Sequence, residues 1–138
     1  MNRFNMTFEL PNAEEFVNLR ILAGMSVRSV EGVKIGLVHT NHMVTFRDGE
    51  LLVGMGRIIG DRATTFQITD VVVHPDYQGK GLGKAIMKEL VDWLEENAVP
   101  PAYVSLIADG DAKFLYEKFE FKVVTPYSVG MHKLIKEG

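Results

Sequence analysis

The sequence predicts a single domain of the α/β (α+β) class, residues 1–138, built on a mixed central sheet. Residues 65–97 read as a strand rich in β-branched side chains, a glycine-rich turn and an amphipathic helix. Asp48-Gly49 lies between two apolar runs, as in a tight hairpin. A further strand after the helix must run parallel to the first by the right-handed crossover rule. The whole pattern predicts about six to seven strands and about four helices, in the order β-α-α-β-β-β-α-β-α-β-β.

Composition limits the classes of function. The chain has 138 residues, of which 46% are hydrophobic and 24% are charged, so it is long enough to bury a core. Its net charge of −3 argues against a nucleic-acid or membrane surface. Without cysteine it has no disulfide, thiolate nucleophile or cysteine metal site. No apolar run reaches the ~18 residues of a membrane span and no signal peptide is evident, so we expect a cytoplasmic protein.

The first part of the chain predicts a strand and two helices. Residues 4–10 alternate apolar and polar side chains, as a strand does. Asn12 and Glu15 have capping-box spacing for a helix that ends near Ala23. A second, weaker helix is expected over residues 29–37, because its two glycines each cost about 1 kcal/mol against alanine. It is either a mobile flank of a substrate cleft or an ordinary surface helix.

The hairpin turn is flanked by two expected strands, residues 42–47 and 51–59. Gly54 and Gly56 interrupt the second strand, which predicts a bulge or a close backbone approach. The chain then enters the central strand, residues 66–73. No internal repeat, low-complexity tract or interdomain linker interrupts this order.

The last third of the chain predicts a strand, a helix and a hairpin. Pro100-Pro101 ends the central helix, and residues 103–108 form the parallel strand. Asp109-Gly110-Asp111 supplies the N-cap of a short helix through Phe119. Two final antiparallel strands are expected over residues 121–125 and 130–134.

A glycine-rich turn, residues 78–83, joins the central strand to a helix over residues 84–97. Without Cβ atoms the turn lets backbone N–H groups approach a ligand closely, and the helix N-terminus favours an anion. The spacing fits no P-loop, because Ala85 and not Ser or Thr follows Lys84, and it fits no dinucleotide fingerprint, which needs glycine at position 84. We therefore expect a pyrophosphate cradle; the alternative is a glycine turn that merely packs tightly.

The turn also matches a family motif. Gln78-x-x-Gly81-x-Gly83 resembles the Gln/Arg-x-x-Gly-x-Gly/Ala pyrophosphate loop of the GNAT-type N-acetyltransferases, and residues 71–83 resemble their acetyl-CoA segment. Ala108-Asp109 and residues 114–119 resemble the second acetyl-CoA segment, and the order of elements is similar over nearly the whole chain. The resemblance implies acetyl-CoA as co-substrate, held by Val71, Val72, Val73, Gln78, Gly79, Lys80, Gly81, Leu82, Gly83, Lys84, Asp109 and Tyr116.

Four positions depart from patterns common in that superfamily. Asp109 stands where many members have Asn, and in this the chain looks like the plastid-type small-amine acetyltransferases. Glu120 stands where members often have glycine, so the helix end must be strained or must terminate differently. Histone-type and N-terminal-protein members have glutamate bases where this chain has Gln67 and Val104. The missing glutamates favour a small-molecule acceptor over a protein.

Three groups are candidates for catalysis of amine acetylation. Asp70, at the cleft end of the central strand, is the candidate base; the alternative is a structural carboxylate that bonds backbone amides. A backbone N–H near Val72 or Val73 would stabilise the carbonyl oxygen. The resemblance implies that Tyr116 protonates the leaving thiolate; otherwise it is a half-buried packing residue.

We expect an enzyme that transfers acetyl from acetyl-CoA to a primary amine by direct attack in a ternary complex. The acceptor is expected to be a small amine: a polyamine, an arylalkylamine or an amino sugar. The alternatives are acetylation of a protein lysine or N-terminus, and a catalytically silent acyl-CoA-binding module. No metal is expected, because no His, Asp or Glu group has ligand spacing, and His74 and His132 read as surface residues. A homodimer and a longer acyl group stay open alternatives.

Overall fold

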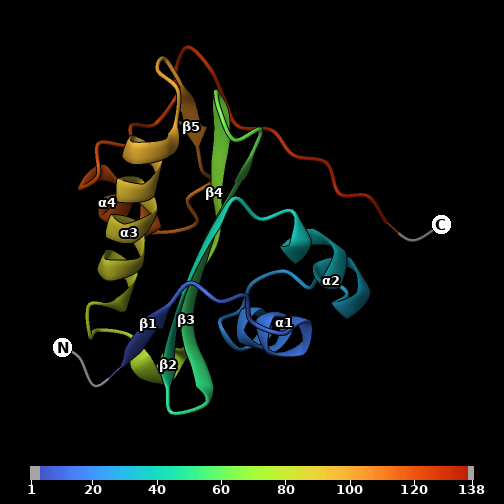
Figure 1. Cartoon of the computed structure of the whole chain (residues 1–138). Coiled ribbons are helices and arrows are strands. Elements are labelled where there is room, and N and C mark those ends of the chain that lie inside the picture. Colours follow the sequence, from blue (N-terminus) through green and yellow to red (C-terminus); the bar gives the residue numbers. More distant parts are fainter. Residues whose placement is uncertain (1–3, 137–138) are drawn as a thin grey trace. The chain divides into compact units, whose positions relative to one another are not determined.

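The computed structural model describes residues 4–136, which belong to two compact units (Figure 1). Within those residues, the first unit, Met1–Leu106, holds a sheet and three α-helices, and the second, Ile107–Gly138, holds one α-helix. The α/β class predicted from the sequence is confirmed. No helix among the described residues is long and apolar enough to cross a membrane.

Five strands form one sheet in the order β1-β2-β3-β4-β5 within the described part of the chain. Neighbouring strands are antiparallel except β4 and β5, which are parallel, as the crossover rule predicted. The elements are β1 (Asn5–Thr7), α1 (Ala13–Leu22), α2 (Val30–Val38), β2 (His42–Asp48), β3 (Leu51–Gly60), β4 (Thr65–Val73), the 3-10 turn η1 (Pro75–Tyr77), α3 (Leu82–Asn97) and β5 (Tyr103–Ser105), followed in the second unit by α4 (Ala112–Glu117).

Helix α1 begins at the cap that the sequence predicts, and α2 begins where the sequence predicts a second helix. Glu15 N donates to Asn12 Oδ1 at 2.8 Å and Asn12 N donates to Glu15 Oε2 at 2.9 Å, which completes the capping box. Ser29 Oγ accepts from Gly32 N at 2.9 Å and caps α2. Glu15 also pairs with Arg47 of β2 at 2.6 Å, and that hydrogen bond lowers the pKa of Glu15. This ion pair ties α1 to the sheet.

Helices cover both faces of the sheet (Figure 1). Helix α3 packs on one face, where Ile86 and Leu90 are fully buried. A Cβ built on Gly56 would lie 2.5 Å from Ile86 Cγ2 and 3.0 Å from Leu90 Cδ1, so only glycine fits there without a shift. The bulge expected at Gly54 and Gly56 is confirmed, because the register of β3 shifts against both β2 and β4, and the close approach to Gly56 is made by side chains of α3. Helices α1 and α2 cover the other face with a buried cluster that includes Phe16, Leu19, Val33, Leu37, Met43 and Met55.

The prediction of two final strands, over residues 121–125 and 130–134, is wrong, because the described part of the second unit contains no strand. Pro126 removes a backbone donor at the turn, where Ser128 N donates to Val124 O at 3.0 Å. An isolated two-stranded hairpin is marginal in water, so apolar alternation alone does not form one. Strands β1 and β5 are also shorter than expected, and the sheet therefore has five strands among the described residues.

Glu120 follows α4 and lies in the left-handed region, with φ of 70°. Of the two expectations for this helix end, strain or a different termination, the structure therefore shows strain. We predict that Glu120→Gly stabilises the second unit by about 1 kcal/mol, because glycine adopts this conformation without a Cβ clash. Slower hydrogen exchange of the α4 amides would measure the gain. Lys118→Gly is the matched control: Lys118 has φ of −67°, so glycine there should speed exchange. Equal exchange in Glu120→Gly and the parent would contradict the prediction.

Candidate active site

The glycine-rich turn enters α3 through two left-handed residues. Gly79 has φ of 77°, and Gly81, the N-cap of α3, has φ of 85°. A Cβ built on either glycine would meet no atom within 4 Å. The tight-packing alternative is therefore wrong for these two glycines. They provide a backbone conformation that other residues adopt only with strain, and the space over the turn stays open.

The N-terminus of α3 carries positive charge. Gly81 offers no side-chain cap, and the first turn of this 16-residue helix has no acidic residue, so its leading N–H groups lack side-chain acceptors among the described residues. Lys80 and Lys84 flank these groups, and neither pairs with a described carboxylate. Gln78 Nε2 donates to Val73 O at 3.3 Å and ties the turn to β4. The helix dipole and the two ammonium groups together favour an anion over this turn.

Strand β4 is bulged next to this turn. The pairing of β3 with β4 shifts between Met55 and Arg57. As a result, Asp70 and Val71 both stand opposite Gly56, which defines a β-bulge. Asp70 takes the left-handed conformation, with φ of 56°, which Asp tolerates better than most residues. A bulge leaves backbone groups out of the ladder, so it can aim an N–H group at a ligand.

One edge of β4 is open beyond the bulge. Strand β5 pairs with β4 only from Thr65 to Gln67, so residues 68–73 have no partner strand on that side among the described residues. The N–H and C=O groups of such an edge can pair with an extended ligand that has amide groups. Residues 71–73 lie at the end of this edge, directly before the glycine-rich turn.

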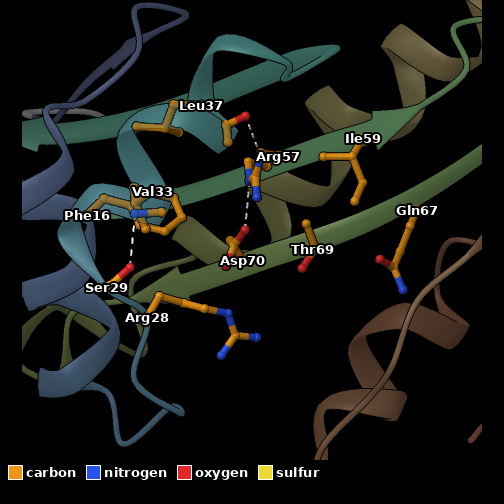
Figure 2. Close-up of a pocket in the computed structure, with 12 residues that line it drawn as sticks. Phe16, Arg28, Ser29, Val33, Leu37, Arg57, Ile59, Gln67, Thr69 and Asp70 are labelled. Atoms are coloured by element: carbon orange, nitrogen blue, oxygen red, sulfur yellow. Dashed lines mark hydrogen bonds and ion pairs between the residues drawn. The ribbon is translucent and has the colours of Figure 1, made fainter. Parts of the chain in front are cut away.

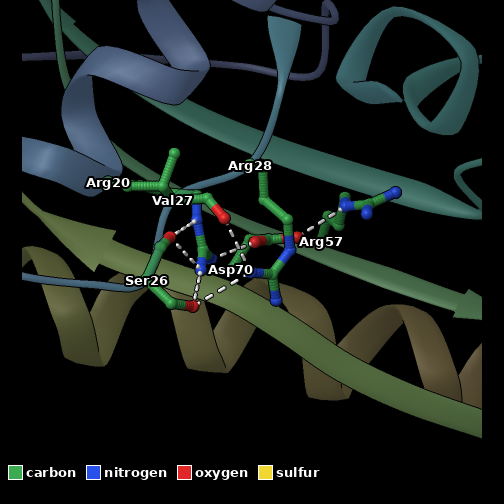
Figure 3. A network of polar contacts seen from close by, with 6 residues as sticks. All are labelled: Arg20, Ser26, Val27, Arg28, Arg57 and Asp70. Atoms are coloured by element: carbon green, nitrogen blue, oxygen red, sulfur yellow. Dashed lines mark hydrogen bonds and ion pairs between the residues drawn. The ribbon is translucent and has the colours of Figure 1, made fainter. Parts of the chain in front are cut away.

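Asp70 lies at the centre of a buried ion network (Figure 3). Its Oδ1 accepts from Arg20 Nη1 at 2.6 Å, and its Oδ2 accepts from Arg57 Nε at 2.7 Å. The side chains of Arg20 and Asp70 are only 4% and 7% exposed. Arg20 Nη2 also donates to Ser26 O at 2.9 Å. Both carboxylate oxygens are engaged by guanidinium groups, which favours the structural interpretation of Asp70, with side chains as partners in place of backbone amides.

Sequence reasoning missed Arg20 and Arg57, although each breaks the apolar pattern of its element. Arg20 follows Phe16 by one helical turn on the buried face of α1, and Arg57 lies between Met55 and Ile59 on one face of β3. A charge at such a position needs a buried partner. The sequence holds that signal but does not identify the partner, which for Arg20 lies 50 positions away.

A cavity of about 380 Å³ opens beside this network (Figure 2). Its walls come from α1, the segment before α2, α2 itself, β3 and β4. Helix α2 therefore lies beside a cavity, in agreement with the expectation that it flanks a cleft. The mobility of α2 stays a prediction. The lining residues are Phe16, Arg28, Ser29, Gly32, Val33, Gly36, Leu37, Arg57, Ile59, Gln67, Thr69 and Asp70.

The remaining site residues from the sequence, Asp109 and Tyr116, belong to the second unit. Asp111, the N-cap of α4, makes no side-chain cap hydrogen bond. Tyr116 is the buried residue of α4, and burial followed by the negative charge of Asp109 raises its pKa. The phenol therefore keeps its proton at neutral pH, as a general acid must before it reacts.

The first unit brings the other predicted cofactor-binding residues together. Residues 71–73 end β4, and residues 78–84 form the turn and the start of α3, where Leu82 is buried. His74 Nδ1 accepts from Asp76 N at 3.1 Å, so this histidine serves the local turn, and His132 is exposed. In the part of the chain that the structure describes, no group of three or more His, Cys, Asp or Glu residues could hold a metal ion.

Comparisons with known proteins agree with this arrangement. The family model for the acetyltransferase (GNAT) family matches residues 26–121. The uncharacterized N-acetyltransferase ycf52 of Porphyra purpurea is 32% identical over 114 residues, which cover 80% of this chain and 64% of that protein. The ribosomal protein bS18-alanine N-acetyltransferase of Escherichia coli is 37% identical over 70 residues, which cover 50% of this chain and 45% of the enzyme.

A solved structure is also similar to this chain over nearly its whole length. The crystal structure of a Staphylococcus aureus protein, described as a probable acetyltransferase, is 41% identical to this chain. It superposes with a TM-score of 0.92 and covers 96% of this chain and 99% of its own. The family match spans well over half of the 138 residues. This chain belongs to the acetyltransferase (GNAT) family.

Proposed function

We propose that this chain is an acetyl-CoA-dependent N-acetyltransferase that acetylates a primary amine by direct attack in a ternary complex. The observation that carries the proposal is the uncapped, cationic N-terminus of α3, which follows the open, bulged end of β4. The first feature suits a pyrophosphate, and the second suits a chain with amide groups. Acetyl-CoA has both, and the family match makes it the expected co-substrate.

The proposed reaction exchanges one bond for another. The amine nitrogen attacks the thioester carbon, so a C–N bond forms and the C–S bond breaks. Backbone N–H groups of residues 71–73 would stabilise the negative charge that develops on the carbonyl oxygen. Tyr116 would donate its phenolic proton to the leaving thiolate, the excess proton of the amine would pass to water, and water would return a proton to the Tyr116 phenolate.

In this proposal Asp70 positions the bulge and does not take the amine proton. Protonation would remove the negative charge that Arg20 and Arg57 contact in a buried site. A left-handed residue other than glycine costs roughly 1–2 kcal/mol, and the two ion pairs from α1 and β3 hold Asp70 in that conformation. A water chain, the alternative to a direct base, then carries the proton away.

The acceptor in this proposal is a small amine bound in the cavity beside Asp70. A volume of about 380 Å³ falls within the usual range of small-molecule sites, roughly 300–1,000 Å³. The competing acceptor is a protein N-terminus or lysine. The observation that favours it is the similarity to the Escherichia coli enzyme, whose name gives the alanine of a ribosomal protein as its acceptor.

Thiol release from acetyl-CoA in the presence of a panel of primary amines tests the proposal. We expect amine-dependent release with at least one small amine, and the acetylated amine as the second product. Release with peptide N-termini or lysines but with no small amine would favour protein acetylation. Acetyl-CoA binding by calorimetry without any amine-dependent release would favour a silent binding module.

We predict that Tyr116→Phe lowers kcat by about 100-fold or more, the usual contribution of a positioned acid. Phenylalanine keeps the ring, so packing and the KM for acetyl-CoA should change little. Tyr127→Phe is the control, because Tyr127 is 97% exposed in the same unit. Steady-state kinetics of both variants make the comparison. An unchanged kcat, or a loss of acetyl-CoA affinity at unchanged kcat, would contradict the role of Tyr116 as the acid.

A further inference from the structure

The cavity beside Asp70 carries more positive than negative charge. Arg28 and Arg57 line it, and Asp70 is the one carboxylate among its described lining residues. Arg20 and Arg57 share that carboxylate, at 2.6 and 2.7 Å. Glu31, in the first turn of α2, does not line the cavity. The network therefore leaves an excess of positive charge toward any molecule that enters.

Of the two arginines that line the cavity, Arg28 is the one that pairs with no described carboxylate. Its Nη1 donates to Ser26 Oγ at 2.9 Å and to Val27 O at 3.2 Å (Figure 3). Ser26 Oγ also accepts from Arg20 Nη2 at 3.1 Å, so Arg28 is joined to the Asp70 network. In the described part of the chain, nothing accepts a hydrogen bond from Nε or Nη2 of Arg28 and no carboxylate pairs with it. One edge of the guanidinium is held, and the edge that suits bidentate binding is free.

The groups around Arg28 complete a polar side of the cavity. Figure 2 shows its side chain extending from the segment before α2 toward the space beside Asp70 and Thr69. The side chains of Thr69 and Gln67 make no hydrogen bond with a described residue, so both can contact a ligand. Phe16, Val33 and Ile59 supply apolar walls. This combination suits a small molecule with a charged end, neutral polar groups and an apolar stem.

We propose that the acceptor carries an anionic oxygen group, a carboxylate or a phosphate, in addition to its amine, and that Arg28 binds this group. This inference rests on the proposed function. A free guanidinium edge matches both oxyanions, because each presents two oxygens to two parallel N–H donors. A polycation would instead meet unbalanced positive charge, so polyamines, one of the acceptor classes expected from the sequence, are disfavoured.

The same excess of positive charge would help the acceptor to react. Only the neutral amine attacks a thioester, and nearby like charge lowers the pKa of an ammonium group. Because the anion of the acceptor would pair with Arg28, the remaining excess comes from Arg20 and Arg57, which share one carboxylate and would favour loss of the proton from an amine bound near them. This effect reduces the need for a direct base, which fits a carboxylate of Asp70 that is already engaged by two arginines.

Matched acceptor pairs test the inference. The members of each pair share an amine and differ in the anion: 4-aminobutyrate with butylamine, and glucosamine 6-phosphate with glucosamine. Spermidine represents the polycations, and thiol release is measured at constant ionic strength. We expect kcat/KM to be at least about 10-fold higher for the anionic member of one pair, the effect of one hydrogen bond to a charged group. The pair that responds identifies the anion as carboxylate or phosphate.

Variants of Arg28 give the second part of the test. Arg28→Met should raise the KM of the anionic acceptor by about 10- to 100-fold and leave the KM for acetyl-CoA unchanged. Arg28→Lys should restore part of the affinity, because lysine keeps the charge but loses the bidentate edge. Arg62→Met is the matched control: Arg62 is exposed, donates to Thr40 O at 3.1 Å and does not line the cavity.

The outcomes separate this inference from the proposed function. Equal kcat/KM within both pairs, or a preference for spermidine, would overturn the inference and leave the proposed function intact. A raised KM for acetyl-CoA in Arg28→Met would also overturn it, because Arg28 would then bind the co-substrate. No turnover with any amine would overturn the proposed function, and the inference with it.

Discussion

Gly81→Glu is expected to lower the affinity for acetyl-CoA by about 100-fold or more, because like charges placed together in a binding site cost several kcal/mol. The new carboxylate would occupy the anion site at the N-terminus of α3, between Lys80 and Lys84. The space over Gly81 is open, so the side chain meets no clash and the first unit should stay folded. Calorimetric titration measures the affinity, and circular dichroism checks the fold.

Three variants separate charge from backbone strain. Gly81→Gln has the same size and the same left-handed strain without the charge, so it should bind acetyl-CoA more tightly than Gly81→Glu. Gly24→Glu places the same charge at a φ of 79°, also in open space, in the connection between α1 and α2, and should bind as the parent does. Gly83→Glu, in the first turn of α3, should repeat the loss. Parental affinity in a folded Gly81→Glu protein would remove the basis for the cradle.

Local patterns predicted most of the first unit. The cap at Asn12 depends on residues three positions apart, and the hairpin turn depends on two neighbouring residues. The segment from β4 through the glycine-rich turn to α3 was predicted as one piece because its parts are consecutive in the sequence. Gly56 predicted a close approach, although the side chains that approach it, Ile86 and Leu90, emerged only from the structure.

Features that depend on residues far apart escaped prediction. The sequence marked Asp70 as important, but its partners lie on α1 and β3 and no pattern links them to it. The glycines of β3 predicted a bulge, but the register shift that places Asp70 and Val71 opposite Gly56 involves both strands, and neither strand shows its position alone. The prediction of the last two strands was wrong for a related reason. Alternation of apolar and polar residues specifies which face of a strand is apolar, but not whether another strand pairs with it.

The bulge and the ion network meet at one residue, Asp70. The left-handed conformation of Asp70 is strained, and a buried carboxylate without a partner is costly. Arg20 from α1 and Arg57 from β3 compensate the charge and fix the direction of the side chain together. The backbone groups that the proposed reaction uses at residues 71–73 are therefore positioned by two arginines on other elements of the fold.

Asp70→Asn is expected to lower the free energy of unfolding of the first unit by about 3–5 kcal/mol, because loss of one partner leaves a buried charge uncompensated. Two guanidinium groups lose their carboxylate here: Arg20, whose side chain is 4% exposed, and Arg57, which is 17% exposed. Asparagine has nearly the same shape and also tolerates the left-handed conformation, so the substitution tests charge alone. Urea unfolding followed by the fluorescence of Trp93, the one tryptophan, measures the change.

Asp92→Asn is the matched control, because Asp92 makes an exposed ion pair with Lys88 at 2.7 Å and its loss should change stability little. The pH dependence of turnover then separates the two roles of Asp70. Loss of a positioning residue should lower kcat by a similar factor at every pH, whereas loss of a direct base would lower it most at acidic pH, where hydroxide is too scarce to replace the base. Adding Arg20→Met to Asp70→Asn should recover part of the stability, since it removes one of the two buried charges left without a partner. Parental stability of Asp70→Asn, with a loss of turnover confined to acidic pH, would return Asp70 to the role of base.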